Sequence, residues 1–140
     1  MNNKFRVWCK NNKEWEKDLT VITQDGYLYQ IKFKDGKLLN FPLRKDTHIV
    51  QFCTGLKDKH HKEIYEGDIL AMTYEYDSTY LGKGKEVNKG VVEWKGYSDG
   101  EYIDNVECWM AYNDPISDCK TENLEIIGNI YENLELLKEA

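Results

Sequence analysis

The fold is decided by residues 54–70, which read Thr54-Gly55-Leu56-Lys57-Asp58-Lys59-His60-His61-Lys62-Glu63-Ile64-Tyr65-Glu66-Gly67-Asp68-Ile69-Leu70. A lysine-rich polar turn leads into the corner Glu66-Gly67-Asp68 and then into an apolar strand. Gly67 permits a sharp bend because it lacks a Cβ atom, and the Asp68 carboxylate can accept backbone amides there. The pattern predicts a scaffolding corner, anchored on the core by Ile64, Tyr65, Ile69 and Leu70.

Strands with alternating polarity precede this corner. Lys4–Cys9 alternates apolar and polar residues, as a strand with one buried face does. Tyr27–Phe33 and Leu38–Leu43 flank Asp35-Gly36, which is typical of a two-residue type I′ hairpin because both positions need positive φ. Pro42 places the second of these strands at a sheet edge.

Further strands are expected on both sides of the corner, at Ile49–Cys53, Ile69–Tyr76, Val87–Trp94, Tyr102–Tyr112 and Leu124–Tyr131. The lysine-rich segment 54–63 is predicted as a loop or extended turn. Asp77–Lys85 is predicted as a flexible loop because it contains Ser, Thr and two Gly. Asn133 is expected to cap a short C-terminal helix with its side chain.

These patterns predict a mainly β fold with a minor helical part. We expect a small SH3-like barrel or a curved antiparallel sheet, with N-terminal hairpins and a short C-terminal helix. The 140 residues suit a single domain, 1–140. Within it, a hairpin subdomain over 1–45 and a barrel-like part over 49–140 are a further possibility.

The four cysteines are scattered, at Cys9, Cys53, Cys108 and Cys119, without a Cys-x-x-Cys pair. No apolar run reaches the ~20 residues that a membrane-spanning helix needs, and the first residues lack the apolar core of a signal peptide. We therefore expect a cytoplasmic protein with reduced thiols that pack as small hydrophobic side chains.

Charge is unevenly distributed along the chain. Residues 1–45 carry ten Lys/Arg against five Asp/Glu, whereas residues 101–140 carry two Lys against ten Asp/Glu. Solvated faces explain most such imbalances, but an acidic late half can also engage a basic partner. The net charge of −6 argues against general nucleic-acid binding, which depends on neutralising phosphates.

Three blocks together resemble the YopX family of phage and prophage proteins: Phe5-Arg6-Val7-Trp8, the segment Thr54–Ile69, and Ile126–Asn133 followed by Leu136-Leu137. The resemblance implies a phage-encoded accessory protein and no catalytic residues. Two departures are visible. His60-His61 stands where relatives often have Asn-Gly or Asp-Gly, and Leu134 stands where relatives often have Pro after the Asn.

The segment Lys57, Lys59, His60, His61 and Lys62 offers two alternatives to the exposed turn that we expect. One is a basic loop that binds nucleic acid or nucleotides. The other is a hydrolase in which His60 or His61 acts as a general base with nearby carboxylates. In an extended segment, however, adjacent side chains point to opposite sides and cannot bind one ion together. A zinc site with Cys108 and Cys119 lacks the usual paired spacing, so no metal and no cofactor is expected.

The late half is rich in carboxylates and aromatic residues. A catalytic centre would need two or three convergent carboxylates from Glu93, Asp99, Glu101, Asp104 and Glu107. Four aromatic residues lie in the same region: Trp94, Tyr97, Tyr102 and Trp109. They could stack on the bases of single-stranded nucleic acid, but we expect them to pack across strands and in the core. Because Trp and Tyr dominate protein-binding sites, we predict contact residues at Glu101, Asp104, Glu107 and Trp109.

The sequence thus favours a non-catalytic accessory protein that acts through protein–protein contacts and counters or modulates host processes. The expected partner is a host or phage protein, with homo-oligomerisation as a further possibility and no membrane association.

Overall fold

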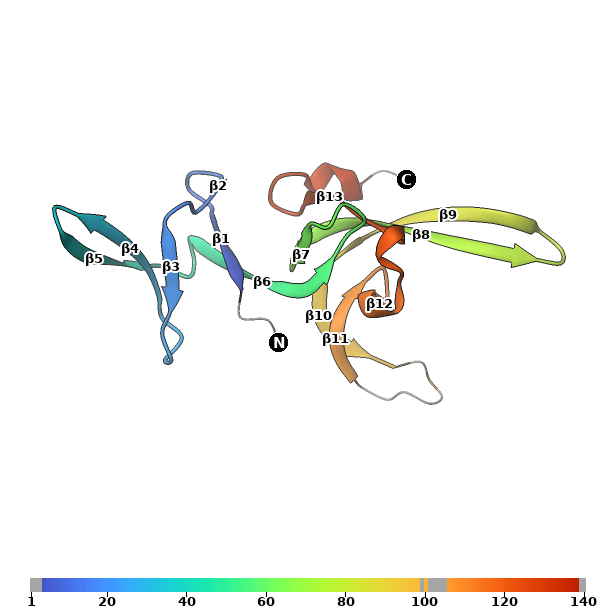
Figure 1. Ribbon diagram of the computed structural model, residues 1–140, viewed down its shortest axis with the longest axis horizontal. Helices are drawn as coiled ribbons and strands as arrows, with labels where there is room; N and C mark the ends of the chain where they lie inside the picture. The colour runs from blue at the N-terminus through green and yellow to red at the C-terminus, as the bar shows by residue number, and fades with distance from the viewer. Residues whose placement is uncertain (1–3, 99, 101–105, 139–140) are drawn as a thin grey trace. The chain divides into compact units, whose positions relative to one another are not determined.

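The computed structural model describes residues 4–98, 100 and 106–138 (Figure 1). Within them the protein is mainly β with short 3₁₀ helices, which confirms the predicted fold class. The chain divides into two compact units, and we call residues 4–52 the N-terminal unit and residues 53–138 the C-terminal unit. No helix in the described part of the chain is long and apolar enough to cross a membrane.

The N-terminal unit consists of short antiparallel sheets. Its strands are β1 (Phe5–Cys9), β2 (Glu14–Trp15), β3 (Leu19–Ile22), β4 (Leu28–Lys34), β5 (Lys37–Leu43) and the first half of β6 (His48–Lys57). One sheet has the order β2-β1-β6 and the other β3-β4-β5. Asp35 and Gly36 both have positive φ, 52° and 73°, which confirms the type I′ turn between β4 and β5.

Aromatic and polar contacts hold β1, β2 and β6 together. Trp8 and Trp15 lie directly opposite each other, with ring centroids 5.0 Å apart at 67°. The Arg6 guanidinium lies 4.1 Å from the Trp15 ring, and Arg6 Nε donates a 3.1 Å hydrogen bond to Gln51 Oε1. Gln51 can therefore be buried without leaving its side-chain oxygen unpaired.

The C-terminal unit is a curled, half-barrel arrangement of antiparallel strands. Its strands are the second half of β6, β7 (Glu63–Tyr65), β8 (Asp68–Ser78), β9 (Gly82–Val91), β10 (Glu93–Tyr97), β11 (Val106–Ala111), β12 (Asp114–Pro115) and β13 (Leu124–Asn129). The sheet orders are β13-β8-β9 and β10-β11-β12, and β6 pairs with β7. Short 3₁₀ helices follow at Ile116–Asp118, Thr121–Asn123 and Leu134–Leu137.

The corner Glu66-Gly67-Asp68 joins β7 to β8 as predicted. Gly67 has φ +83°, a conformation that costs a residue with a Cβ about 1–2 kcal/mol. Asp68 Oδ2 accepts a 2.7 Å hydrogen bond from the Tyr65 amide. The backbone of the corner also forms hydrogen bonds with Val92 and Ile130. Gly67 N donates to Val92 O, and Val92 N donates to Asp68 O. Ile130 N donates to Gly67 O.

The core lies directly beneath this corner. Ile64, Ile69 and Leu70 are fully buried, which confirms their predicted anchoring role. Burial of each such side chain contributes roughly 1.5–3 kcal/mol. The corner is therefore scaffolding, with its glycine and its aspartate both buried.

Asp58 ties the polar turn 58–62 to β13. Its carboxylate is fully buried. Oδ1 accepts the amides of His60 and Lys62 at 2.9 and 3.0 Å, and Oδ2 accepts the amide of Ile126 at 3.1 Å. Burial raises the pKa of Asp58, but these three hydrogen bonds outweigh it and hold the pKa below its usual range.

Two predicted loops are wrong in part. Residues 54–57 belong to β6, because Lys57 pairs with Glu63 across a bulge where Gly55 has φ +83°. The predicted loop Asp77–Lys85 is mostly hairpin, since β8 and β9 pair as far as Ser78 and Gly82. Oppositely charged residues face each other along this hairpin, which compensates for its glycines.

The C-terminal end also differs from the prediction. The helix is a single 3₁₀ turn, and the Asn133 side chain makes no cap hydrogen bond to it. Instead, Asn133 Oδ1 accepts the Asn129 amide at 3.2 Å, beside Gly128, where a Cβ would collide with the Asn133 side chain. The predicted interruption of this strand at Gly128 is confirmed as a register shift in β13.

Replacing Asp58 by Asn is expected to destabilise the protein by about 1–3 kcal/mol at pH 7, since the amide group would turn a donor toward one of three backbone amides. The pKa of Asp58 is lower in the folded state than in the unfolded state. The stabilisation that the ionised carboxylate contributes is therefore fully present above the unfolded pKa of about 3.9, and it is lost as pH falls through the folded pKa. Urea denaturation at pH 7 and at pH 3 measures the unfolding free energy of wild type and variant.

The difference between wild type and Asp58→Asn should therefore shrink at pH 3. Asp77→Asn is the matched control, because Asp77 is an exposed carboxylate on β8, and it should change stability little at either pH. Equal losses in both variants would contradict the role given to Asp58.

Candidate functional site

The predicted binding residues that the structure describes lie on β11. Glu107 is exposed and Trp109 is buried. Glu101 and Asp104, predicted with them, lie outside the described residues. Trp109 pairs directly with Trp94 of β10, so the two indoles share one face of the β10-β11-β12 sheet.

The two tryptophans form a cross-strand aromatic pair. Their ring centroids are 5.1 Å apart and their planes meet at 72°, an edge-to-face arrangement. Trp109 is only 9% exposed, whereas Trp94 is 39% exposed. The predicted cross-strand packing is thus confirmed, and one of the two rings remains available to a ligand.

Glu107 lies beside the exposed indole. It pairs across the strands with Gly96, so it lies on the same face of the sheet as Trp94 and Trp109. Trp94 Nε1 donates a long hydrogen bond of 3.4 Å to Glu107 Oε2. An acidic group is therefore held at the edge of an aromatic surface.

A groove of about 220 Å³ opens at this pair, and we call it the tryptophan groove. It is lined by Thr54, Leu56, Trp94, Glu107, Cys108, Trp109 and Ser117. The β6 side of the groove is fixed, because Thr54 Oγ1 donates to Ile64 O at 2.8 Å and accepts the Leu56 amide at 3.0 Å. The wall that faces the aromatic pair is consequently rigid.

This lining suits a long cationic side chain. An aromatic face within about 6 Å of a Lys or Arg head group attracts it electrostatically, and the methylene stem packs on apolar groups such as Leu56. The exposed Glu107 carboxylate would balance the charge. The groove is too small for more than one large side chain, so it would hold an anchor of a longer segment.

The other predicted groupings of the late half do not come together. By strand register, Glu93 and Tyr97 lie on the opposite face of the sheet from Glu107, Trp94 and Trp109. The carboxylate alternative is therefore wrong for Glu93 and Glu107, and the four-ring platform is wrong for Tyr97. The remaining members of both groups, Asp99, Glu101, Tyr102 and Asp104, lie outside the described residues.

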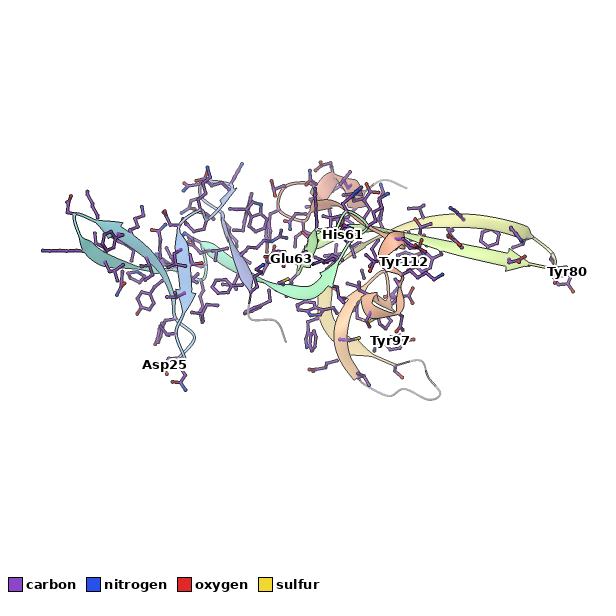
Figure 2. All side chains as sticks on the ribbon, viewed as in Figure 1. Asp25, His61, Glu63, Tyr80, Tyr97 and Tyr112 are labelled. Atoms are coloured by element: carbon purple, nitrogen blue, oxygen red, sulfur yellow. The ribbon has the colours of Figure 1, made fainter. Side chains whose placement is uncertain are left out.

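In the predicted basic loop, Lys57 is the last residue of β6, and Lys59, His60, His61 and Lys62 lie in an exposed turn between β6 and β7. Figure 2 labels His61 of this turn. His61 has φ +64°, so a residue other than glycine takes a positive-φ position in this turn. Lys59 lies 2.6 Å from Glu125, and its ammonium group holds the pKa of that carboxyl below its usual range. One of the three lysines is thus paired within the chain.

Two carboxylates lie two residues from a histidine. Asp58 points inward to the backbone amides, and Glu63 Oε2 accepts a long hydrogen bond of 3.5 Å from the Tyr65 hydroxyl. In the part of the chain that the structure describes, no three His, Cys, Asp or Glu side chains gather as metal ligands do. Cys9 and Cys53 are buried, and Cys108 and Cys119 are partly buried.

The family described as YopX protein matches residues 4–138. The chain belongs to the YopX family. No curated protein matches it at a significant level.

Two solved structures resemble this YopX-family chain over nearly its whole length. Protein EF1440 from Enterococcus faecalis is 25% identical, with a TM-score of 0.52 over 96% of each chain. Protein YopX from Bacillus subtilis is 20% identical, with a TM-score of 0.54 over 97% of this chain and 98% of that one. The second likeness concerns the fold alone.

One further surface of this chain was not predicted from the sequence. Register places Leu19, Val21, Tyr29, Ile31, Phe33 and Leu38 on one face of the β3-β4-β5 sheet, which we call the apolar sheet face. Phe33 is 72% exposed and Leu38 is 68% exposed. The alternation of Tyr27–Phe33 was a visible signal, but alternation does not tell which face is covered.

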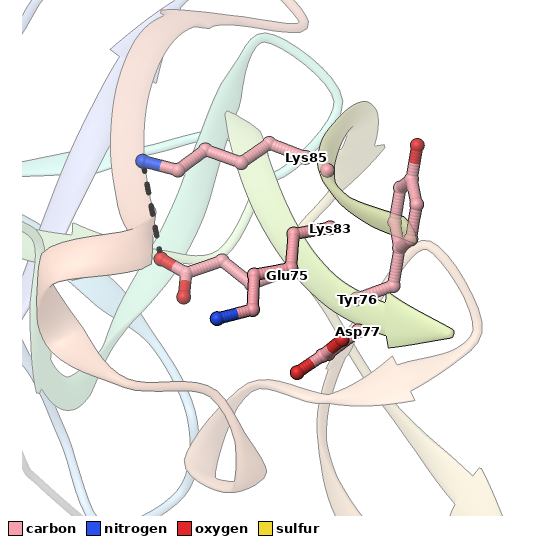
Figure 3. A pocket seen from close by; sticks show the side chains of 6 residues that line it. Glu75, Tyr76, Asp77, Lys83 and Lys85 are labelled. Atoms are coloured by element: carbon pink, nitrogen blue, oxygen red, sulfur yellow. Dashed lines mark ion pairs between the residues drawn. The ribbon is translucent and has the colours of Figure 1, made fainter. Parts of the chain in front are cut away.

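The β8-β9 hairpin carries a second depression, of about 570 Å³ (Figure 3). Glu75 and Lys85 face each other in it, with a nitrogen–oxygen distance of 4.0 Å. Tyr76 packs over Gly84, where any Cβ would collide with the phenol ring. The depression lies on one hairpin with both charge signs, so it presents no distinct ligand chemistry.

A pair of substitutions tests the arrangement of the groove. Trp109→Ala is expected to cost about 3–5 kcal/mol of unfolding free energy, because it empties a buried site. Trp94→Ala should cost about 1–2 kcal/mol, since this ring is partly exposed. Urea denaturation followed by far-UV circular dichroism measures both, and similar losses would contradict the arrangement.

Proposed function

We propose that this protein is a non-catalytic phage or prophage accessory protein that acts in the bacterial cytoplasm through protein–protein contacts. In this role it counters or modulates a host process. The observation that supports the proposal is the tryptophan groove, where an exposed indole and an exposed carboxylate lie side by side on a rigid sheet. Exposed Trp of this kind is typical of binding hot spots.

The partner that fits best is a host or phage protein with an exposed Lys or Arg. Residues 53–140 carry nineteen Asp/Glu against nine Lys/Arg, so the C-terminal unit attracts basic partners over distance. The cationic side chain would lie on Trp94 and reach Glu107. Glu101 and Asp104 remain predicted contributors to the same contact.

The two alternatives have weaker support. A nucleic-acid or nucleotide binder would use Lys57, Lys59 and Lys62, but Lys59 is paired with Glu125 and the unit around the loop is strongly acidic. A hydrolase would need an orienting carboxylate for His60 or His61. The neighbouring Asp58 is occupied by three backbone amides.

The double variant Trp94→Ala/Glu107→Lys tests the proposal. Affinity capture from the bacterial host, with wild type and variant side by side, should show a partner whose recovery falls about tenfold or more in the variant. The captured protein is then purified, and its dissociation constant is measured by calorimetry at two salt concentrations, because a charged contact weakens with salt.

Glu93→Lys is the matched control, since it makes the same charge change on the opposite face of β10. Partner affinity should be close to wild type in this control. If the double variant binds the partner as wild type does, the groove is not the contact site. If Glu93→Lys weakens binding equally, overall charge and not the groove explains the interaction.

A further inference from the structure

The apolar sheet face is uncharged and open. The register of β3, β4 and β5 puts no charged residue on this face, and Asn40 and Pro42 complete it on β5. Leu19 is 66% exposed and Val21 is 37% exposed, in addition to Phe33 and Leu38. An exposed sheet face of this composition is unfavourable in water unless another surface covers it.

The opposite face of the same sheet is different. There Leu28 is 3% exposed and packs inside the N-terminal unit, while Lys32, Lys34 and Lys37 supply charge toward the hairpin end. Lys32 Nζ lies 5.9 Å from the centre of the Phe41 ring, so even the apolar Phe41 is partly screened by a cation. The opposite face therefore mixes lysines with the partly exposed Leu39 and Phe41, whereas the apolar sheet face carries no charged residue.

We propose that the apolar sheet face is covered by the same face of a second copy of this chain. The two sheets would pack face to face, about 10 Å apart, as the layers of a β-sandwich do. This inference concerns self-association and is independent of the tryptophan groove, which lies in the other unit.

The exposed area supports a second copy. A fully exposed large side chain contributes on the order of 200 Å², so Leu19, Val21, Phe33 and Leu38 together offer on the order of 500 Å². The partly exposed Tyr29 and Ile31, with Asn40 and Pro42, bring the face close to the roughly 800 Å² per partner of a standard interface. A small ligand could not cover a flat surface of this extent.

Charge decides between a second copy and an unlike partner. In a two-fold interface each patch meets itself, so any charge on it would face a like charge near the axis. The N-terminal unit carries ten Lys/Arg against six Asp/Glu, and yet its exposed apolar face has none of them. A charge-free face is what self-pairing of a basic unit requires, whereas an unlike acidic partner would be better bound by a face that includes lysines.

The variant Phe33→Ser/Leu38→Ser tests the proposal, because these two residues pair across β4 and β5 and are the most exposed large apolar side chains of this face. Its matched control is Lys32→Ser/Leu39→Ser, the adjacent cross-strand pair, which points to the opposite face. Sedimentation equilibrium over a concentration series should show a wild-type dimer. The dissociation constant should rise about a hundredfold or more in the first variant and stay within a few-fold in the control.

A monomeric wild type at every concentration would overturn the proposal, and the face would then belong to an unlike partner. A dimer that both variants leave intact, or that both disrupt equally, would overturn it as well.

Because the serine substitutions could also unfold the sheet, a second measurement uses wild type alone. In a mixture of ¹³C-labelled and unlabelled chains, filtered NOEs should link the Phe33 ring of one copy to methyl groups of Leu19, Val21 or Leu38 of the other. Their absence in the dimer places the interface elsewhere and refutes the inference.

Discussion

Backbone amides that leave the strand ladders must still find acceptors when they are buried. In the C-terminal unit two aspartates supply them. Asp58 accepts three amides from its own turn and from β13, and Asp68 accepts the Tyr65 amide at the corner into β8. These carboxylates can be buried because hydrogen bonds replace their lost hydration. The turns around them are positioned by charge and hydrogen bonding as much as by apolar packing.

A side-chain hydrogen bond also supports the sheet that carries the tryptophan groove. Tyr74 of β8 donates a 2.8 Å hydrogen bond to Asp114 Oδ2, which ties β12 to the central hairpin. Burial and this hydrogen bond raise the pKa of the Tyr74 phenol. Next to β12, β11 carries the buried indole of Trp109, so the exposed Trp94 rests on a supported neighbour. Recognition can then reside in few side chains, because the strands beneath them are fixed.

Much of the fold was predictable because it depends on local backbone chemistry. Asp35-Gly36 and Gly67 mark positions where positive φ is required, and the structure has positive φ at all three. The hairpin tip at 77–85 was mispredicted because Ser, Thr and Gly suggest a loop, whereas the cross-strand pairing that orders them is visible only once β8 and β9 are aligned. The role of Asn133 was mispredicted for a similar reason, since its partner Asn129 precedes it in a turn and not in a helix.

The candidate site was predictable only in part. Glu107 and Trp109 were chosen for residue type, but they line the groove together with Trp94 and Leu56, which come from other strands. Periodicity can assign residues to opposite faces of a strand, yet it cannot say which face another element covers. For this reason the sequence alone did not indicate that Phe33 and Leu38 are exposed.

The ten-residue strand β6 has a consequence for how the chain can be cut. It pairs with β1 from His48 to Phe52 and with β7 from Cys53 to Lys57, so the border between the two units falls inside one continuous strand. Limited proteolysis should spare this border, because no exposed linker crosses it. A fragment that ends or begins there would carry half a strand with a frayed end.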